Sequence, residues 1–272
     1  FIEDCAVSLD HLADYTAQLK EIFKKYNTSG MFYAHASVGT LHIRPVLNMK
    51  SDEDIKTMRS ISEESFEIVK NYKGSHSGEH GDGIVRSEFH EMMFGKKIVN
   101  AFEEIKDTFD SKNLLNPGKI VRPFKSNDRD LMRYKLGYQA QNISTHYDWS
   151  NWGQFTDAVE MCNNNGACRK LDSGVMCPSY RVTKEEKDLV RGRANTLRLA
   201  LSNQLPEGSF ASKEMYETME LCVSCKACQR ECPMSVDMAK MKSEFLSHYY
   251  KKFSMRIKDR ITSEMPRLIW LL

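Results

Sequence analysis

The sequence lacks any apolar run of 18 residues, which is the length that a helix needs to cross a membrane. It also lacks a large net charge, because 39 Lys and Arg residues stand against 37 Asp and Glu residues. A charge balance of this kind implies no nucleic-acid partner. The start shows no signal-peptide pattern, and residue 1 is Phe rather than Met. We therefore expect a cytoplasmic protein without a membrane span, and a chain that is a fragment of a longer one.

The composition is that of an ordinary globular protein, with 41% hydrophobic and 28% charged residues. A length of 272 residues is enough for two domains. The 8 cysteines favour metal or cluster ligation over disulfides, because a chain without a signal peptide meets a reducing compartment. Cys5 has no cysteine near it in the sequence, and we expect it to be a buried structural thiol.

The stretch LCVSCKACQRECP carries the most specific motif of the chain, which we call the second cysteine run. Its cysteines follow the spacing C-x2-C-x2-C-x3-C and precede a proline: Cys222, Cys225, Cys228, Cys232 and Pro233. This is the spacing of iron–sulfur ligands in bacterial ferredoxins, where three thiolates on one loop hold one cluster and the fourth holds another. A zinc site or disulfides are the alternatives.

A related pattern, the first cysteine run, lies upstream and contains Cys162, Cys168 and Cys177. Asn165 stands where the second run has Cys225. If the last cysteine of each run crosses over, two ligand sets result: Cys222, Cys225, Cys228 and Cys177 form one, and Cys162, Cys168 and Cys232 form the other. We expect one [4Fe–4S] cluster and a second that is either [3Fe–4S] or a [4Fe–4S] with a non-cysteine ligand such as Asn165.

The first half of the sequence predicts helices packed on an antiparallel sheet, an α+β fold. Residues 31–36 and 40–47 show the pattern of two strands, and a glycine-rich loop, GSHSGEHGDG, spans 74–83. A capping box at Ser51-x-x-Asp54 predicts the start of a long helix, and residues 89–109 are expected to be helical in two pieces. The alternation in the second strand places His42 and Arg44 on one face.

Histidines and a carboxylate in this half suit a divalent ion such as zinc or manganese. His35 and His42 end the hairpin-like segment, and Glu79 and His80 lie in the glycine-rich loop. Arg44 is a planar cation that suits a substrate carboxylate. The alternative is that these histidines are half-buried structural side chains.

The segments HASVGTLHIRPVL, SGEHGDGIVRSEF and LNPGKIV together resemble the C-terminal half of FAD-linked oxidases, over residues 1–124. That family includes D-lactate dehydrogenases, the glycolate oxidase flavin subunit and D-2-hydroxyglutarate dehydrogenases. The resemblance implies that His35, His42 and Glu79 hold a divalent metal beside the flavin. It also implies that His80 is the base for the substrate hydroxyl.

Further roles follow from the same resemblance. Asn116 and Gly118 match a family segment that passes close to the flavin. Arg44 replaces an Asn of some relatives, which leaves room for a second substrate carboxylate. Arg86 is a candidate for substrate or flavin contact, with a solvated loop arginine as the alternative. Because the family binds FAD mainly through an N-terminal domain, we expect this chain alone to hold FAD weakly and to be inactive.

The second half resembles α-helical ferredoxin domains, such as those of succinate dehydrogenase iron–sulfur subunits. The blocks CRK, MCPSY, RGRAN and CKACxxECPxxVDMA recur in fused flavin and iron–sulfur oxidoreductases. A capping box at Thr183-x-x-Glu186 predicts the start of a helix to about Leu205. Basic residues on that helix predict a solvated face, or an anionic docking surface: Arg191, Arg193 and Arg198.

We therefore predict three parts: an FAD-linked oxidase C-terminal domain at 1–124, a linker at 125–157 and an all-α helical ferredoxin domain at 158–272. The predicted function is oxidation of a small D-2-hydroxy acid by hydride transfer to FAD. Electrons then leave singly through the clusters to a quinone or an electron-transfer protein, with peripheral association at the inner membrane face left open. The alternatives are an electron-transfer module without a substrate site, and a zinc-binding interaction module.

Overall fold

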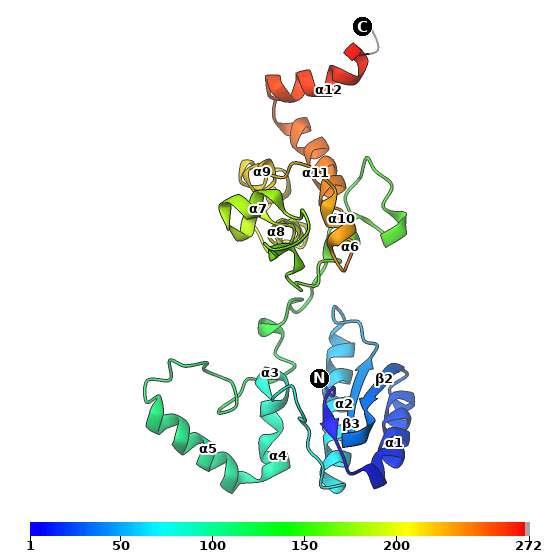
Figure 1. Ribbon diagram of the computed structural model, residues 1–272, viewed down its shortest axis with the longest axis vertical. Helices are drawn as coiled ribbons and strands as arrows, with labels where there is room; N and C mark the ends of the chain where they lie inside the picture. Colours follow the sequence, from blue (N-terminus) through cyan, green and yellow to red (C-terminus); the bar gives the residue numbers. More distant parts are fainter. Residues whose placement is uncertain (270–272) are drawn as a thin grey trace. The chain divides into compact units, whose positions relative to one another are not determined.

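The computed structural model describes residues 1–269 and contains two compact units (Figure 1). The first unit runs from Phe1 to Tyr138, and the second begins at Gln139. The range 125–157, predicted as a linker, is thus divided between the two units.

Side-chain contacts show how each part of that range is attached. Arg129 donates a hydrogen bond of 3.1 Å to the carbonyl oxygen of Met49, within the first unit. The carboxylate of Glu244 accepts hydrogen bonds from the backbone amides of His146 and Tyr147, at 2.9 and 3.0 Å, within the second unit. Both parts of the range therefore have specific hydrogen-bonding partners.

The first unit is built around a three-stranded antiparallel sheet with the strand order β1-β3-β2. Its strands are β1 (Cys5–Ala6), β2 (Gly30–His35) and β3 (Thr40–Pro45). The register pairs Tyr33 with His42, and Met31 with Arg44. Since side chains alternate along a strand, Leu41 and Ile43 point to the face opposite to that of His42. The predicted hairpin is confirmed, with each strand ending slightly earlier than expected.

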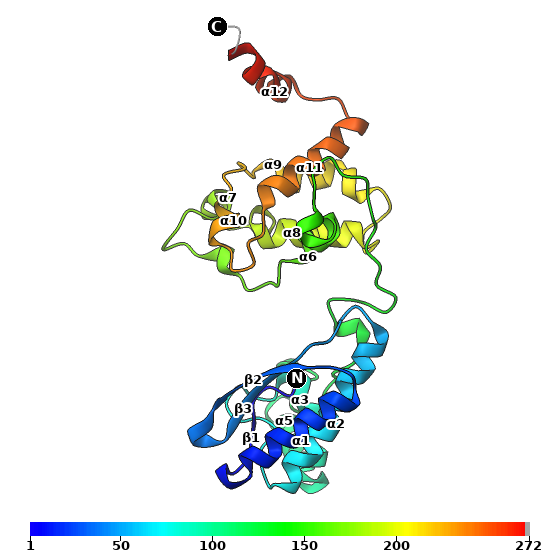
Figure 2. The ribbon, with the colours of Figure 1, turned by 90° about the vertical axis from the view of Figure 1, so that its right-hand side faces the viewer.

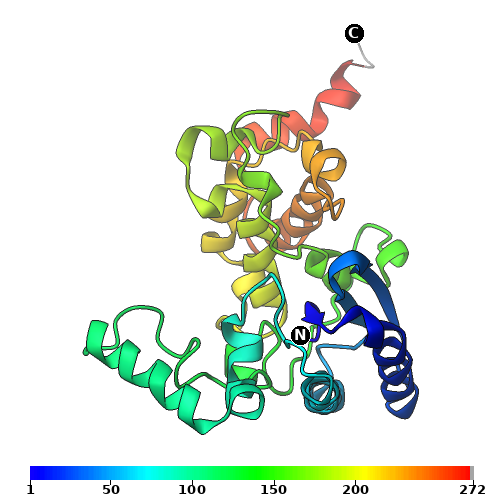
Figure 3. The same ribbon diagram turned by 60° about the horizontal axis from the view of Figure 1, so that its bottom comes forward.

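Two long helices, α1 (Leu12–Lys25) and α2 (Asp52–Asn71), pack against each other and cover one face of this sheet (Figures 2 and 3). Their apolar faces form one buried cluster with Leu41 and Ile43 of β3. The predicted cap of α2 is present, because the Ser51 hydroxyl accepts a hydrogen bond from the Asp54 amide. The opposite sheet face is thereby left for polar side chains.

Shorter helices follow the glycine-rich loop: α3 (Gly83–Arg86), α4 (His90–Phe94) and α5 (Lys96–Phe109). The helix predicted over 89–109 is thus broken into two pieces at Gly95, whose φ is +80°. Cys5 is fully buried, as expected of a structural thiol.

The described residues of the second unit form helices and loops, with no strand. The helices are α6 (Phe155–Glu160), α7 (Pro178–Thr183), α8 (Val190–Leu201), α9 (Lys213–Glu220), α10 (Ala227–Glu231), α11 (Met238–Lys252) and α12 (Ile257–Ile269). The predicted fold class, α+β followed by all-α, is confirmed. The last three residues of the predicted range 158–272 lie outside the described part.

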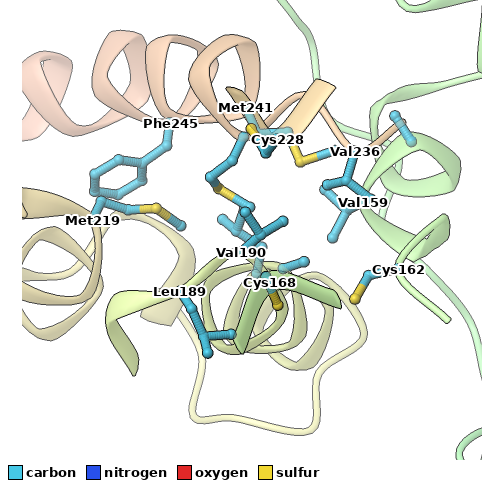
Figure 4. Packing of buried hydrophobic residues seen from close by; sticks show 14 of the residues in the cluster. Val159, Cys162, Cys168, Leu189, Val190, Met219, Cys228, Val236, Met241 and Phe245 are labelled. Carbon is cyan, nitrogen blue, oxygen red and sulfur yellow. The ribbon is translucent and has the colours of Figure 1, made fainter. Parts of the chain in front are cut away.

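Helix α8 lies at the centre of this unit and contacts α6, α9 and α11. Figure 4 shows its residue Val190 among apolar side chains from neighbouring elements, with Cys162, Cys168 and Cys228 in the same cluster. Both cysteine runs therefore contribute to the core, although Cys225 is exposed.

The start predicted for this helix at Thr183 is wrong. Thr183 ends α7, and Lys184 has a φ of +61°, so the chain leaves the helical conformation there. A 3₁₀ turn, Glu186–Asp188, follows, and α8 begins only at Val190. Among the described residues, no helix has the length and apolar content that crossing a membrane requires.

Candidate functional site

The glycine-rich loop is fixed by one buried carboxylate, that of Asp4 beside β1. This carboxylate accepts hydrogen bonds from the backbone amides of Gly78, Glu79 and His80, at 2.9, 2.8 and 2.8 Å. Burial alone would raise the pKa of Asp4, but the amides of His80 and Glu79 lower it below its usual value. The loop is therefore held through its backbone, which leaves the side chains of Glu79 and His80 free to face outward.

Those two side chains meet two strand histidines in what we call the histidine cluster: His35, His42, Glu79 and His80. One carboxylate oxygen of Glu79, Oε1, lies 3.2 Å from His35 Nε2, 3.1 Å from His42 Nε2 and 3.6 Å from His80 Nε2. The His42 side chain is buried, whereas those of His35, Glu79 and His80 are exposed. The site is therefore polar, with His42 buried at its bottom and the other three side chains accessible to solvent.

The donor set fits a divalent ion. The Nε2 atoms of His35 and His42 both lie close to Glu79 Oε1, and two imidazoles with a carboxylate are a zinc-type ligand set. The ligand atoms that lie within 4.8 Å of one another belong to His42, Glu79, His80 and Asp4, a group that does not contain His35. Behind His42, its Nδ1 lies 4.0 Å from Glu3 Oε1 and has no hydrogen-bond partner. A carboxylate behind a histidine is the usual arrangement for orienting a metal ligand.

Arg44 lies on the same sheet face, as its alternation with His42 predicted. Its guanidinium donates a hydrogen bond of 3.1 Å to Glu3 Oε1, which also accepts one of 2.9 Å from the Tyr33 hydroxyl. Burial opposes the effect, but the bonds from Tyr33 and Arg44 hold the pKa of Glu3 below its usual value. The Arg44 side chain is still 57% exposed, so it remains accessible to an anion beside the histidine cluster.

Arg86 is not the solvated loop arginine of the alternative interpretation, because it is only 6% exposed. Its guanidinium donates hydrogen bonds to the carbonyl oxygens of Gly81, at 2.7 Å, and Glu3. It thus joins the glycine-rich loop to the segment before β1 and has a positioning role.

Asn116 and Gly118 lie on the segment that follows α5. Asn116 lines an open hollow of about 490 Å³ together with Phe102, Ile105 and Ile120. Gly118 has a φ of +74°, and a Cβ there would lie 2.0 Å from the Phe124 ring. The positive φ favours glycine at this turn, and a side chain there would displace the Phe124 ring.

In the second unit, one enclosed cavity is lined by cysteines from both runs: Cys177, Cys222, Cys225 and Cys228. This is the four-thiolate set that crossing of the runs predicts. Burial raises the pKa of Cys177 to about 12 and also raises the pKa of Cys228, so without a metal these thiols stay protonated. Four convergent sulfur donors around one cavity fit a [4Fe–4S] cluster.

The other predicted ligand set, Cys162, Cys168 and Cys232, has three cysteines instead of four. Cys162 and Cys168 are buried, and burial together with the nearby Cys162 raises the pKa of the Cys168 thiol. The 3₁₀ turn that carries Cys168 contacts α10, which leads directly into Cys232. Asn165 uses its side chain to bond Asn163 and the Ala167 amide.

A neighbouring asparagine, Asn164, contacts a cysteine of this set. Asn164 Oδ1 lies 3.8 Å from Cys162 Sγ and accepts a hydrogen bond of 2.7 Å from Asn195. Spacing alone pointed to Asn165, because it aligns with Cys225 in the second run. The left-handed φ of +65° at Asn164 turns the chain and changes which side chain faces the sulfur.

The arginines of α8 do not form the solvated face that was expected. Arg193 is fully buried and Arg198 is 8% exposed. Arg193 lines the four-cysteine cavity and donates hydrogen bonds to the carbonyl oxygens of Thr218 and Asp188, at 2.9 and 2.8 Å. A buried cation at this place favours an anionic cluster.

Sequence analysis missed three residues that shape these sites: Glu3, Asp4 and the cavity-lining role of Arg193. Glu3 and Asp4 are joined to the histidine cluster by long-range contacts, which spacing does not reveal. The only available signal for Arg193 was its position within the block RGRAN, on a helix between the two cysteine runs.

Comparison with known families divides the chain in two. A model of the C-terminal domain of FAD linked oxidases matches residues 1–120. A model of the 4Fe-4S dicluster domain matches residues 158–236. The first match contains the histidine cluster, and the second contains both cysteine runs.

Curated relatives share both parts in the same order. D-2-hydroxyglutarate dehydrogenases of Pantoea ananatis and Escherichia coli are 31% and 29% identical to the chain over 97% of its length. The chain spans only 29% of the length of these relatives. A glycolate oxidase subunit of Bacillus subtilis is 29% identical over 44% of the chain, which covers 25% of that protein.

Proposed function

Since residues 1–120 belong to the C-terminal domains of FAD linked oxidases and residues 158–236 to the 4Fe-4S dicluster domains, we propose that the chain is part of a flavin- and iron–sulfur-dependent dehydrogenase of D-2-hydroxy acids. The resemblance drawn from the sequence motifs is thereby confirmed for both domains. Similarity to D-2-hydroxyglutarate dehydrogenases over 97% of the chain supports the reaction class.

The histidine cluster is the observation that carries this proposal. His35, His42 and Glu79 would hold a divalent ion, which would polarise the substrate hydroxyl and bind its carboxylate. His80 lies at the exposed edge of the cluster, with its Nε2 3.6 Å from Glu79 Oε1. From there it accepts the hydroxyl proton as the carbon–hydrogen bond at C2 breaks, which yields a 2-oxo acid.

Cofactors supply the redox part of the reaction: FAD accepts the hydride, and iron–sulfur clusters pass electrons on one at a time. The chain's own contribution is to fix the substrate and its proton acceptor. Asp4 and Arg86 hold the loop that carries His80, through backbone amides and carbonyls. The hollow beside Asn116 and Ile120 is the candidate for flavin contact on this side.

Arg44 is the candidate for substrate selection. It lies on the same face as His42 and is accessible to solvent. Its guanidinium donates a hydrogen bond to Glu3 and lies 5.3 Å from the centroid of the Tyr33 ring. A second carboxylate on the substrate could replace Glu3 as its partner. A dicarboxylic 2-hydroxy acid of the hydroxyglutarate class therefore fits this site better than lactate or glycolate.

For the clusters, we propose a [4Fe–4S] centre on Cys177, Cys222, Cys225 and Cys228. The second centre uses Cys162, Cys168 and Cys232, with Asn164 closest to the remaining corner. It is either a [3Fe–4S] centre or a [4Fe–4S] centre with a non-cysteine ligand. The electron acceptor is a quinone or an electron-transfer protein, because clusters release single electrons.

Replacing His42 by Ala in the flavin-containing protein tests the substrate site. We expect turnover of D-2-hydroxyglutarate, D-lactate and glycolate to be lost while iron and sulfide contents stay unchanged. His11→Ala is the matched control, because His11 lies on the surface and stacks only on Tyr72. Full turnover in the His42 variant would instead favour an electron-transfer module without a substrate site of its own.

A further inference from the structure

Three side chains form a second histidine cluster in the first unit: His76, Asp82 and His90. His76 and Asp82 come from the glycine-rich loop, and His90 is the first residue of α4. The two histidines are 1% and 2% exposed, and the Asp82 side chain is 24% exposed. These residues share no member with the histidine cluster around Glu79, and nothing in the proposed reaction uses them.

The distances between their polar atoms match those between the ligands of one metal ion. His90 Nε2 lies 3.0 Å from Asp82 Oδ2, and His76 Nε2 lies 3.6 Å from Asp82 Oδ1. One nitrogen or oxygen from each residue lies within 4.8 Å of the others. Ligands held tetrahedrally at about 2.0–2.1 Å from zinc are roughly 3.3–3.4 Å apart, so the observed separations bracket that spacing.

The orientation of His90 is fixed from behind. Its Nδ1 lies 3.2 Å from the carbonyl oxygen of Ile120, so Nδ1 carries a proton and donates it. Ile120 has a φ of +64°, which is rare for a β-branched residue, and its amide donates a hydrogen bond of 3.2 Å to Ser87 Oγ. The carbonyl of this strained residue thus orients the ring so that Nε2 faces Asp82. In metal sites, a ligating histidine is commonly oriented in this way by a hydrogen bond from its other ring nitrogen.

Buried polar atoms of all three side chains lack a hydrogen-bond partner: both ring nitrogens of His76, Oδ1 of Asp82 and Nε2 of His90. Because buried polar atoms are normally hydrogen-bonded, a group of such atoms in one place needs an explanation. One cation between His90 Nε2 and the Asp82 carboxylate would satisfy both side chains.

His76 is buried with neither ring nitrogen hydrogen-bonded. Burial lowers its pKa, so it is neutral and offers a lone pair. The rings of Phe66 and Phe94 lie beside it, with centroids 5.5 and 5.6 Å away, and the polar groups around it are Asp82, His90 and the backbone of Arg86. A cation bound at Nε2 would satisfy the His76 ring together with His90 and Asp82.

We propose that His76, Asp82 and His90 bind one divalent transition-metal ion of the zinc class. Two imidazoles and one carboxylate are a zinc-type donor set, and the phenylalanine rings keep the site dry on one side. The nearby charge of Arg86 opposes a cation, but its guanidinium already donates to the Gly81 and Glu3 carbonyls. The ion would join the glycine-rich loop to α4, and so would fix the segment that carries Glu79 and His80.

Metal content separates this site from the histidine cluster. The probe is zinc, supplied during expression of the complete 272-residue chain and counted per chain alongside iron. In a His42→Ala background, which disables the histidine cluster, we expect about one zinc to remain. Adding His90→Gln should remove that zinc, and adding His11→Ala, at an exposed surface histidine, should not.

Equal zinc in the His42→Ala chain with and without His90→Gln would overturn the proposal, as would no zinc in either. The metal site proposed around His42 is tested separately, by the zinc that His42→Ala removes. A negative result there leaves the test of the His90 site unaffected. Should the His90 variant not fold, anomalous scattering at the zinc edge on crystals of the unmodified chain decides the question. An anomalous peak between His76, Asp82 and His90 supports the site. If crystals grown with zinc show no such peak, the proposal is overturned.

Discussion

At the scale of single residues, Asp4 fixes the backbone of the loop that carries two residues of the candidate active site, Glu79 and His80. Its carboxylate accepts the amides of three consecutive loop residues, Gly78 to His80. Because those bonds are to a charged acceptor, each contributes more than a neutral hydrogen bond. The loop geometry therefore depends on a residue that lies 75 positions before Glu79 in the sequence.

We predict that Asp4→Asn destabilises the first unit by about 2–3 kcal/mol at pH 7, because an amide cannot accept three N–H bonds. Hydrogen exchange at the Gly78, Glu79 and His80 amides should accelerate strongly. Asp10→Asn, at an exposed carboxylate, is the control. Unchanged exchange at these three amides would contradict the assigned role of Asp4.

The same carboxylate gives the first unit an acid-sensitive component. The pKa of Asp4 is lowered in the folded state, so its stabilising contribution is complete above its unfolded value, about pH 3.9. That contribution is lost as the pH falls further, through the folded-state pKa. The free energy of unfolding in urea, measured from pH 5 downward, should fall less with pH in Asp4→Asn than in the unmodified chain.

Arg193 is the residue that we expect to tune the four-cysteine centre. If a separation of about 8 Å is assumed, a unit charge at an effective dielectric constant of about 20 contributes about 2 kcal/mol, on the order of 90 mV for one electron. Arg193→Gln should lower the reduction potential of that centre by an amount of this order, and Arg193→Lys should lower it far less. A redox titration followed by EPR measures both, and equal potentials in the two variants would exclude this electrostatic role.

At the scale of elements, the sequence predicted those whose signals are local. The alternation in β3 placed His42 and Arg44 on one face, and Ser51 correctly marked the start of α2. The start of α8 was missed, since Thr183-x-x-Glu186 has the spacing of a capping box but Thr183 ends a different helix. Which of two competing local signals prevails depends on tertiary packing that spacing does not contain.

Close packing of the 3₁₀ turn Glu186–Asp188 on α8 depends on Gly192. A Cβ at this position would lie 1.9 Å from the carbonyl oxygen of Glu186. We predict that Gly192→Ala destabilises the second unit by about 1–3 kcal/mol, because the turn must move away from the helix. Glu217→Ala, an exposed position in α9, is the comparison in thermal unfolding. A Gly192 variant as stable as that control would show that the turn moves freely.

The sites were predicted less completely than the elements. Ligand types with fixed spacing, such as the cysteines of the second run, were identified from the sequence directly. Contacts between distant segments were not, so Glu3, Asp4 and the pairing of His76 with His90 emerge only from the fold. The burial of Arg86 and Arg193 could not be predicted either, because the sequence does not distinguish a buried arginine from an exposed one.

At the scale of the whole molecule, the two units divide the work of the proposed enzyme. In this proposal, the first unit would carry the substrate-binding groups and the second the electron-transfer centres. We predict that the 272-residue chain purified by itself contains clusters but no stoichiometric FAD, because only a C-terminal domain of the flavin family is matched. Flavin absorbance and FAD released on denaturation measure this, and one FAD per chain would refute it.

The most direct test of the account is the iron, acid-labile sulfide and zinc content of the anaerobically purified chain, with EPR spectra before and after reduction. We predict about seven or eight irons with a matching amount of sulfide, that is, two clusters. A three-iron signal in the oxidised sample would assign the second centre as [3Fe–4S], and eight irons without it would mean that a non-cysteine ligand completes a [4Fe–4S]. Zinc at the cysteines with little iron would contradict the account and leave a zinc-binding interaction module.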